Sequence, residues 1–161
     1  MAIIDLTGDA YHYWSVDVKK LARFADPLAD DIWGVGVIDP EEILSCPNKQ
    51  LGSTPSSMMQ STARTREYHI ARIAYLMEHG WEDVNNEEMR VYSPTDYFES
   101  ILSMSDDDFS PATIRQRQRL RITDGNHRFC AALLSGGGAL KVEPYGDLPF
   151  LHKALDPVSV L

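Results

Sequence analysis

Residues 119–134 read Arg-Leu-Arg-Ile-Thr-Asp-Gly-Asn-His-Arg-Phe-Cys-Ala-Ala-Leu-Leu, and they indicate the fold more directly than any other stretch. From Leu120 to Thr123 apolar and polar residues alternate, which predicts a strand. From His127 to Leu134 the chain is rich in Ala and Leu, which predicts a helix. Residues 124–128 therefore form a glycine turn that joins the strand to the start of the helix, whose first residues it includes.

This turn has the residue types of an anion site. The first turn of a helix presents unpaired N–H groups and a partial positive charge. Gly125 lets the backbone approach a ligand closely because it has no Cβ, and Arg128 can hold a phosphate with two hydrogen bonds. We expect Gly125, Asn126, His127 and Arg128 to bind the phosphate of a nucleotide.

Two residues of the turn have more than one role open. His127 is a candidate acid–base group or phosphate donor, because a histidine titrates near neutral pH, and it can equally cap the turn. Asp124 is a candidate catalytic carboxylate and ligand for a magnesium ion bound to the phosphates. Its more ordinary role is to accept backbone N–H groups at the helix start.

The strand, the Asp-Gly-x-His-Arg turn and the Ala-rich helix resemble the ParB/sulfiredoxin superfamily. Residues 33–44 are similar to the opening strand and turn of that family, and residues 69–81 are similar to its helix ending in a glycine. Residues 89–92 are similar to its next strand. The resemblance implies an α/β fold with a small mixed sheet and packed helices. It places the family-like core at residues 33–146.

The rest of the chain is assigned around that core. We expect a single domain over residues 1–161, with an N-terminal extension at 1–32 and a C-terminal tail at 147–161. A chain of 161 residues with 43% hydrophobic residues is large enough for one such domain. Residues 45–66 are rich in Ser, Thr, Pro and Gly, which predicts a long loop.

The resemblance also implies a range of activities. Members of the superfamily bind nucleotides with this loop, and they include DNA clamps, nucleases, a free-serine kinase and sulfiredoxin. A nucleoside triphosphate such as ATP, with Mg²⁺, is the cofactor that follows. Asn126 stands where sulfiredoxins carry their catalytic cysteine, and asparagine cannot form a sulfur intermediate. We therefore do not expect sulfinic-acid reduction.

The kinase branch suggests a base near the first core strand. Glu42 is the candidate, with Glu41 as its neighbour, because a glutamate after that strand serves as base in those kinases. Asp39-Pro40-Glu41-Glu42 is also an ordinary helix start, with proline and acidic residues in the first turn. The helix start is the more ordinary interpretation.

A stripe of arginines precedes the glycine turn. If the strand extends backwards, Arg117, Arg119 and Arg121 project from one face and offer contacts to DNA or to nucleotide phosphates. The alternative is a solvated face paired with nearby acidic residues, because charge stripes are usually solvated. Either interpretation leaves the glycine turn as the better defined site.

Composition restricts the partners. The net charge of −9 argues against a protein that coats DNA, although an acidic surface can meet a protein partner. No segment reaches the roughly 20 apolar residues of a membrane span, and the N-terminus lacks the pattern of a signal peptide. The two cysteines, Cys46 and Cys130, have no metal-binding spacing, so we expect reduced thiols in a cytoplasmic protein.

Three functions follow from the sequence. The first is a ParB-like nuclease or NTPase, a hydrolase in which the turn holds phosphate and His127, Asp124 or Glu42 assists. A compact acidic member of this kind suits a mobile genetic element. The second is a nucleotide-dependent kinase of a small molecule. The third is a non-enzymatic protein-binding module with a degenerate nucleotide site.

Overall fold

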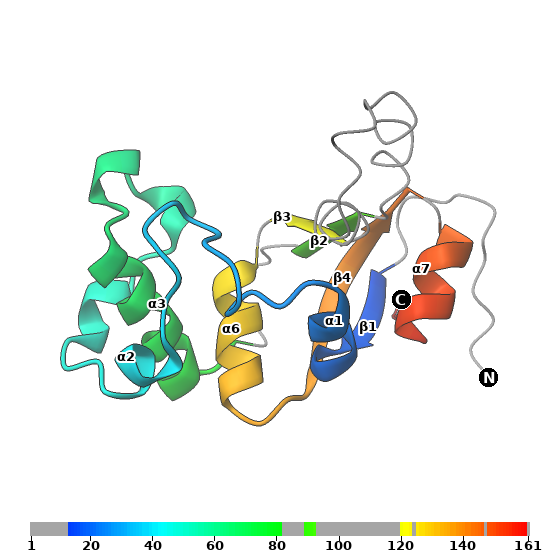
Figure 1. Cartoon of the computed structure of the whole chain (residues 1–161), viewed down its shortest axis with the longest axis horizontal. Coiled ribbons are helices and arrows are strands. Elements are labelled where there is room, and N and C mark those ends of the chain that lie inside the picture. Colours follow the sequence, from blue (N-terminus) through cyan, green and yellow to red (C-terminus); the bar gives the residue numbers. More distant parts are fainter. Residues whose placement is uncertain (1–12, 82–88, 93–119, 124, 147, 161) are drawn as a thin grey trace, which may run out of the picture. The chain divides into compact units, whose positions relative to one another are not determined.

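The computed structural model describes residues 13–81, 89–92, 120–123, 125–146 and 148–160. It is a mixed α/β structure (Figure 1), and its sheet has the strand order β3-β2-β4-β1-β5. The predicted fold class, a small mixed sheet with helices, is confirmed. The chain separates into two compact units, the first made of Met1–Ala25, Glu88–Asp124 and Ala139–Leu161 and the second of Asp26–Glu87 and Gly125–Gly138. The single domain stays a prediction.

The first unit contains the whole sheet. Its strands are β1 (Tyr13–Asp17), β2 (Met89–Tyr92), β3 (Arg121–Thr123), β4 (Ala139–Tyr145) and β5 (Val158–Val160). Strand β4 pairs parallel with β2 and antiparallel with β1, and the two outer pairs are antiparallel. The strands predicted at 120–123 and 89–92 are therefore confirmed.

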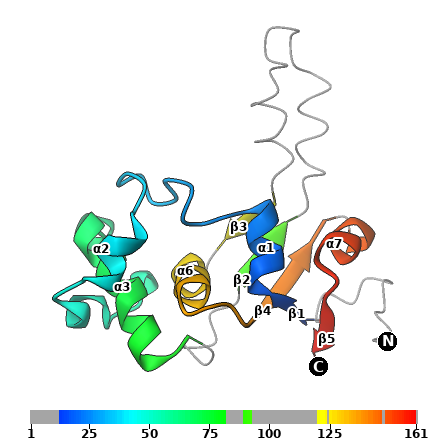
Figure 2. The same ribbon diagram turned by 60° about the horizontal axis from the view of Figure 1, so that its bottom comes forward.

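Alternation decides which face of the sheet is buried. Trp14 and Val16 are buried on β1, and they stand opposite Val142 and Leu140 on β4. Residues two apart on a strand point to the same face, so these four side chains form one apolar surface. Helices α1 (Val18–Phe24) and α7 (Leu148–Leu155) belong to this unit (Figure 2), where α1 contacts β1 and α7 contacts β4.

The second unit is helical. Its helices are α2 (Pro40–Leu44), α3 (Arg66–His79) and α6 (Asn126–Leu134), and three 3-10 turns, η1 (Lys49–Gly52), η2 (Ser56–Met58) and η3 (Ser61–Ala63), lie between α2 and α3. The buried residues of its core are Ile38, Ile43, Ile73, Ala74, Leu76, Cys130 and Ala131. This core holds α2, α3 and α6 together.

The helix ends follow the sequence. Asp39 caps α2 through a capping box with Glu42, and Pro40 occupies the first turn. Thr65 caps the N-terminus of α3 by accepting a hydrogen bond from the Tyr68 amide. Gly80 ends α3 with a φ of 97°, a conformation that favours glycine. The helix predicted before Gly80 is confirmed, and so is the helix start at Asp39.

The strand expected within residues 33–44 is wrong. Residues 33–39 contain bends and no strand, because Gly34 and Gly36 both adopt positive φ values of 70° and 87°. The Arg66 guanidinium donates to the carbonyls of Val35 and Gly36 at 3.0 and 3.2 Å. A side chain thus satisfies carbonyls that a strand would pair with a neighbour.

The loop predicted at residues 45–66 is fastened to α3. Arg72 donates from Nη1 to the carbonyls of Gly52 and Ser53, at 3.0 and 3.3 Å. The hydroxyl of Tyr68 donates to the carbonyl of Thr54. Gly52 is buried so closely against α3 that a Cβ would overlap the backbone of Ala71. The part of this segment around Gly52 to Thr54 therefore packs directly on α3 as part of the second unit.

Candidate functional site

The glycine turn has the conformation that its sequence predicts. Gly125 adopts the left-handed region, with φ 75° and ψ 9°, and it is the N-cap of α6. Its carbonyl accepts the first helical hydrogen bond, from the Phe129 amide at 2.9 Å. Because glycine has no side chain, the N-cap residue offers no capping oxygen to the first-turn amides of α6. These amides suit an anion.

His127, in this first turn, forms a pair with a second histidine. Its Nε2 lies 2.9 Å from Nδ1 of His69, which comes from α3. His69 is buried, with 2% of its surface exposed, and His127 is partly buried. Helices α3 and α6 pack together through the core described above, so the helix packing sets the distance between the two rings.

Trp33 covers both imidazoles at once. Its ring centroid lies 4.6 Å from that of His69 and 4.5 Å from that of His127, with an interplanar angle of 13° in each case. The two imidazoles are themselves nearly parallel, at 12°. Tyr68 meets both rings edge-on. The hydrogen-bonded pair is thus enclosed by aromatic surface that fixes the ring planes.

This enclosure lowers the pKa of both histidines. Burial lowers the pKa of His127 from 6.5 to about 3, and the neighbouring His69 and Arg72 act in the same direction. Burial also lowers the pKa of His69, while a hydrogen bond to the backbone of Arg64 opposes that effect. Near neutral pH the pair is therefore uncharged.

The charges around the pair are positive. The positive charge of Arg72 lowers the pKa of His127, and the positive charge of Arg64 lowers the pKa of His69. Arg72 is 4% exposed, and its hydrogen bonds go to backbone carbonyls. Within the described part of the chain, no carboxylate forms an ion pair with Arg72. A buried guanidinium without a carboxylate favours an anionic ligand nearby.

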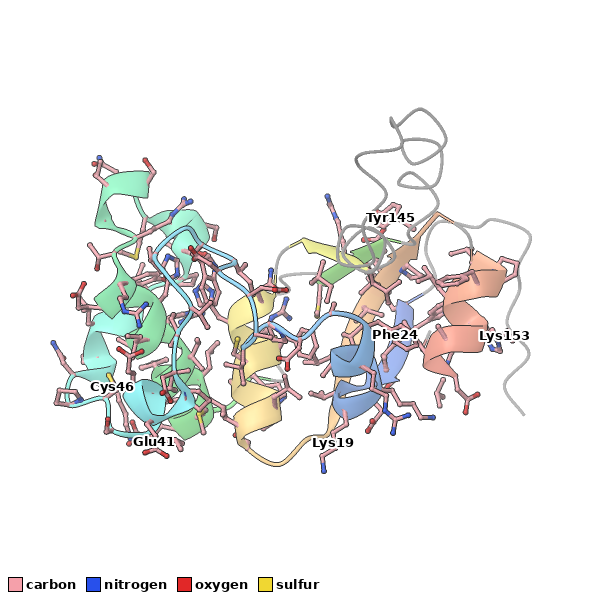
Figure 3. The ribbon with its side chains drawn as sticks, in the orientation of Figure 1. Lys19, Phe24, Glu41, Cys46, Tyr145 and Lys153 are labelled. Carbon is pink, nitrogen blue, oxygen red and sulfur yellow. The ribbon has the colours of Figure 1, made fainter. Side chains whose placement is uncertain are left out.

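Glu42 has structural duties. One of its carboxylate oxygens accepts hydrogen bonds from the Asp39 amide at 3.0 Å and from Arg66 Nη2 at 2.6 Å. The same guanidinium contacts the backbone of residues 35–37. Glu41, which precedes Glu42 on α2, is labelled in Figure 3, together with Cys46 just after that helix. The interpretation of Glu42 as part of a helix start agrees with these contacts.

The structure describes some of the predicted site residues and not others. Gly125, Asn126, His127 and Arg128 lie together at the start of α6, and Arg128 is partly buried. Asp124, Arg117 and Arg119 lie outside the described residues. Arg121 is described only as backbone at the start of β3. The arginine stripe and the Asp124 metal ligand therefore stay predictions.

Three residues of the site were not expected from the sequence. They are His69, Trp33 and Arg72. A signal for two of them exists, because His69 and Arg72 lie three apart on the side of α3 that also buries Ile73 and Leu76. A polar residue on an otherwise apolar helix face needs a partner, and here the partner of His69 is His127.

Comparisons with known proteins add no relative. No protein-family model matches the chain, and no curated protein or solved structure matches it either. The described residues contain no cluster of three or more His, Cys, Asp or Glu side chains arranged to hold a metal ion. No described helix is long and apolar enough to cross a membrane.

Proposed function

We propose that this protein binds a phosphate group of a nucleotide or nucleic acid at residues 125–128 and hydrolyses a phosphoester or phosphoanhydride bond there. The observation that carries the proposal is the uncharged His69–His127 pair, which lies at the start of α6 and is enclosed by Trp33. The ParB/sulfiredoxin resemblance of the glycine turn agrees with this assignment.

Local electrostatics support an anionic ligand. Three groups can donate hydrogen bonds to an anion and carry no negative charge that would repel it. They are the first-turn amides of α6, the Arg128 side chain and the buried Arg72. The overall charge of −9 does not oppose this, because a small basic pocket can hold one phosphate in an acidic protein. One phosphate with Mg²⁺ needs fewer positively charged contacts than a length of DNA, which is bound through many phosphates.

The chemistry of His127 depends on the ligand. With a pKa of about 3 in the protein alone, His127 is a weak base at neutral pH. An anionic phosphate beside the ring stabilises its protonated form and raises the pKa toward neutrality. Binding of the substrate thus turns a neutral hydrogen-bonding group into an effective acid–base group.

One observation favours a binding module as the second candidate. Burial, the largest cause of the low His127 pKa, is typical of a structural histidine as well as of a catalytic one. In that case the turn binds a nucleotide or a protein partner without turnover. The kinase proposal is supported less, because Glu42 already pairs with Arg66 and caps α2.

Turnover distinguishes the two candidates. We would measure phosphate release from nucleoside triphosphates and cleavage of DNA, each with Mg²⁺, for the wild type and for His127→Gln. The proposed hydrolase loses about 10²–10⁴-fold in rate in this variant. The control is His79→Gln, an exposed histidine at the end of α3. Nucleotide binding without hydrolysis in the wild type would favour the binding module.

A further inference from the structure

We infer that Arg66 is a positioning residue of the candidate site, because it holds in place the loop that lays Trp33 over the two imidazoles. This loop consists of residues 33–38, between the start of the second unit and α2. The inference rests on the proposed function for its effect on turnover, whereas the effect on Trp33 is measured without nucleotide.

The guanidinium of Arg66 makes four hydrogen bonds through its two Nη atoms. Nη1 donates to the carbonyls of Val35 and Gly36, at 3.0 and 3.2 Å. Nη2 donates to the carbonyl of Val37 at 3.3 Å and to the carboxylate of Glu42 at 2.6 Å. Because a guanidinium is planar and presents its donors as a rigid fork, it holds these acceptors in one arrangement.

The backbone of the 33–38 loop depends on side chains for its hydrogen bonds. Among the described residues, no backbone–backbone hydrogen bond involves this loop. The Val35 amide donates to Asp31 Oδ1 at 2.9 Å, and the Val35 carbonyl accepts from Arg66. The backbone is thus fixed by two side chains only two positions after Trp33.

Gly36 allows the guanidinium to approach the loop. A Cβ at Gly36 would lie 3.3 Å from Arg66 Nη1, which is closer than ordinary van der Waals contact. Gly36 also has a φ of 87°, a conformation that favours glycine. Beyond the contacts with Arg66, Ile38 is buried in the core of the second unit. The loop is therefore fixed by Arg66 at residues 35–37 and by apolar packing at Ile38.

Arg66 and His69 lie in the same turn of α3, three positions apart. Residues at this spacing are neighbours on the surface of a helix. The turn that carries one imidazole therefore also fixes the loop whose indole covers that imidazole and the ring of His127. A displacement of the loop would disturb both stacking contacts of Trp33 together, and Arg66 opposes that displacement.

The wild type provides the first test and requires no variant. We would record ¹⁵N NMR spectra of the arginine side chains in the full chain, without ligand and near neutral pH. The four hydrogen bonds of Arg66 should slow rotation about its Nε–Cζ bond, so that its two Nη atoms give separate signals. A single averaged Nη signal for Arg66, as expected for the exposed Arg23, would overturn the inference.

Substitutions of Arg66 test whether the guanidinium holds Trp33. Arg66→Met removes all the donors, and Arg66→Lys keeps the charge but replaces the fork with a single nitrogen. In chains labelled with 5-fluorotryptophan, we expect the ¹⁹F resonance of Trp33 to move in both variants and that of Trp14 to stay. Glu42→Gln is the control, because it leaves the three carbonyl contacts and should leave the Trp33 resonance in place. An unmoved Trp33 resonance in folded Arg66→Lys would contradict the role of the fork.

A double-mutant cycle separates positioning from a general loosening of the structure. If Arg66 acts on His127 through Trp33, Arg66→Lys raises the pKa of His127 when Trp33 is present and has no further effect in the Trp33→Leu background. The pKa values come from an NMR pH series of each variant. Additive shifts would show that Arg66 acts on His127 by another route, and they would contradict the inference.

The failure of the inference differs from the failure of the proposed function. We expect Arg66→Lys to lower turnover by up to about 10²-fold, because a displacement of about 1 Å near the reacting groups has that effect. If Arg66 holds Trp33 in place but the wild type binds and hydrolyses no nucleotide or DNA, the proposed function is wrong. If the wild type hydrolyses a nucleotide while Arg66→Lys keeps the Trp33 resonance and full turnover, the inference alone is wrong.

Discussion

His69 and His127 are 58 positions apart in the chain, yet Nδ1 of the first lies 2.9 Å from Nε2 of the second. Both belong to the second unit, in which α3 supplies His69 and α6 supplies His127. A buried polar pair of this kind is costly unless each nitrogen has a partner. The packing of α3 against α6 therefore fixes the position of a residue in the glycine turn that begins α6.

Stability is expected to depend on the charge state of this pair. Folding lowers the pKa of His127 from 6.5 to about 3, so the unfolded chain binds more protons between these values. The contribution of His127 to stability is full above pH 6.5 and falls as the pH decreases toward about 3, by up to about 1.4 kcal/mol per pH unit. Denaturant unfolding across this window measures the slope.

A pair of variants assigns that slope. In His127→Gln the dependence of the unfolding free energy on pH becomes shallower, with a remainder from His69, whose pKa burial also lowers. In His79→Gln, an exposed control, the slope stays at its wild-type value. An unchanged slope in His127→Gln would show that His127 is already exposed and titrates normally.

Removing the Trp33 ring should raise the pKa of His127. The indole lies on both imidazoles and contributes to their burial, which is the main cause of the low pKa. We expect Trp33→Leu to move the His127 titration toward 6.5 in an NMR pH series. Trp81→Leu is the matched control, because Trp81 also packs on the core of this unit. An equal shift in both variants would exclude a specific effect of Trp33.

Glu42→Gln separates a structural glutamate from a catalytic base. Its carboxylate pairs with Arg66 and is partly exposed, so we expect the loss of about 0.2–1 kcal/mol of stability. Turnover should remain near the wild-type rate. Glu41→Gln, on the exposed side of the same turn, is the control. A fall in the rate of phosphoryl transfer by orders of magnitude in Glu42→Gln alone would restore the kinase proposal.

Gly52→Ala tests how closely the 45–66 segment is fastened to α3. A Cβ at this position would overlap the backbone of Ala71 and Arg72, so we expect about 3 kcal/mol of destabilisation or loss of folding. Gly34→Ala has a φ of 70° and open space around the Cβ, so it costs only the conformational strain of about 1–2 kcal/mol. Unfolding curves of equal midpoint would contradict the close approach at Gly52.

Much of the fold was predictable because local signals agree with it. The alternation at 120–123, the glycine at 125 and the Ala-rich run after it give β3, the turn and α6. The cap at Asp39 and the stop at Gly80 give the ends of α2 and α3. In each case a residue type determines the backbone within a few positions.

The parts that the sequence does not predict depend on distant contacts. Strand β1 is short and lies in the stretch that was expected to be an N-terminal extension. It pairs with β4, more than 120 positions away in the sequence. Similarly, α7 and β5 lie where a tail was expected, and β5 owes its conformation to pairing with β1. At residues 33–39 the resemblance favoured a strand, but two glycines and Arg66 hold a different backbone.

The candidate site shows the same division. Gly125 and His127 were found because they lie close together in a recognisable turn. His69, Trp33 and Arg72 become part of the site only through the packing of α3 and the loop 33–39 around α6. No spacing rule links these positions, because their proximity comes from tertiary structure.

Calorimetric titration with nucleotides tests the central claim most directly. ATP, CTP, GTP and UTP, each with magnesium, would be titrated into the wild type, into Arg128→Ala and into the exposed control Arg23→Ala. We expect one nucleotide to bind the wild type and the control with micromolar affinity and to lose binding to Arg128→Ala. Absence of binding to the folded wild type, or equal binding by Arg128→Ala, would contradict a nucleotide phosphate site at residues 125–128.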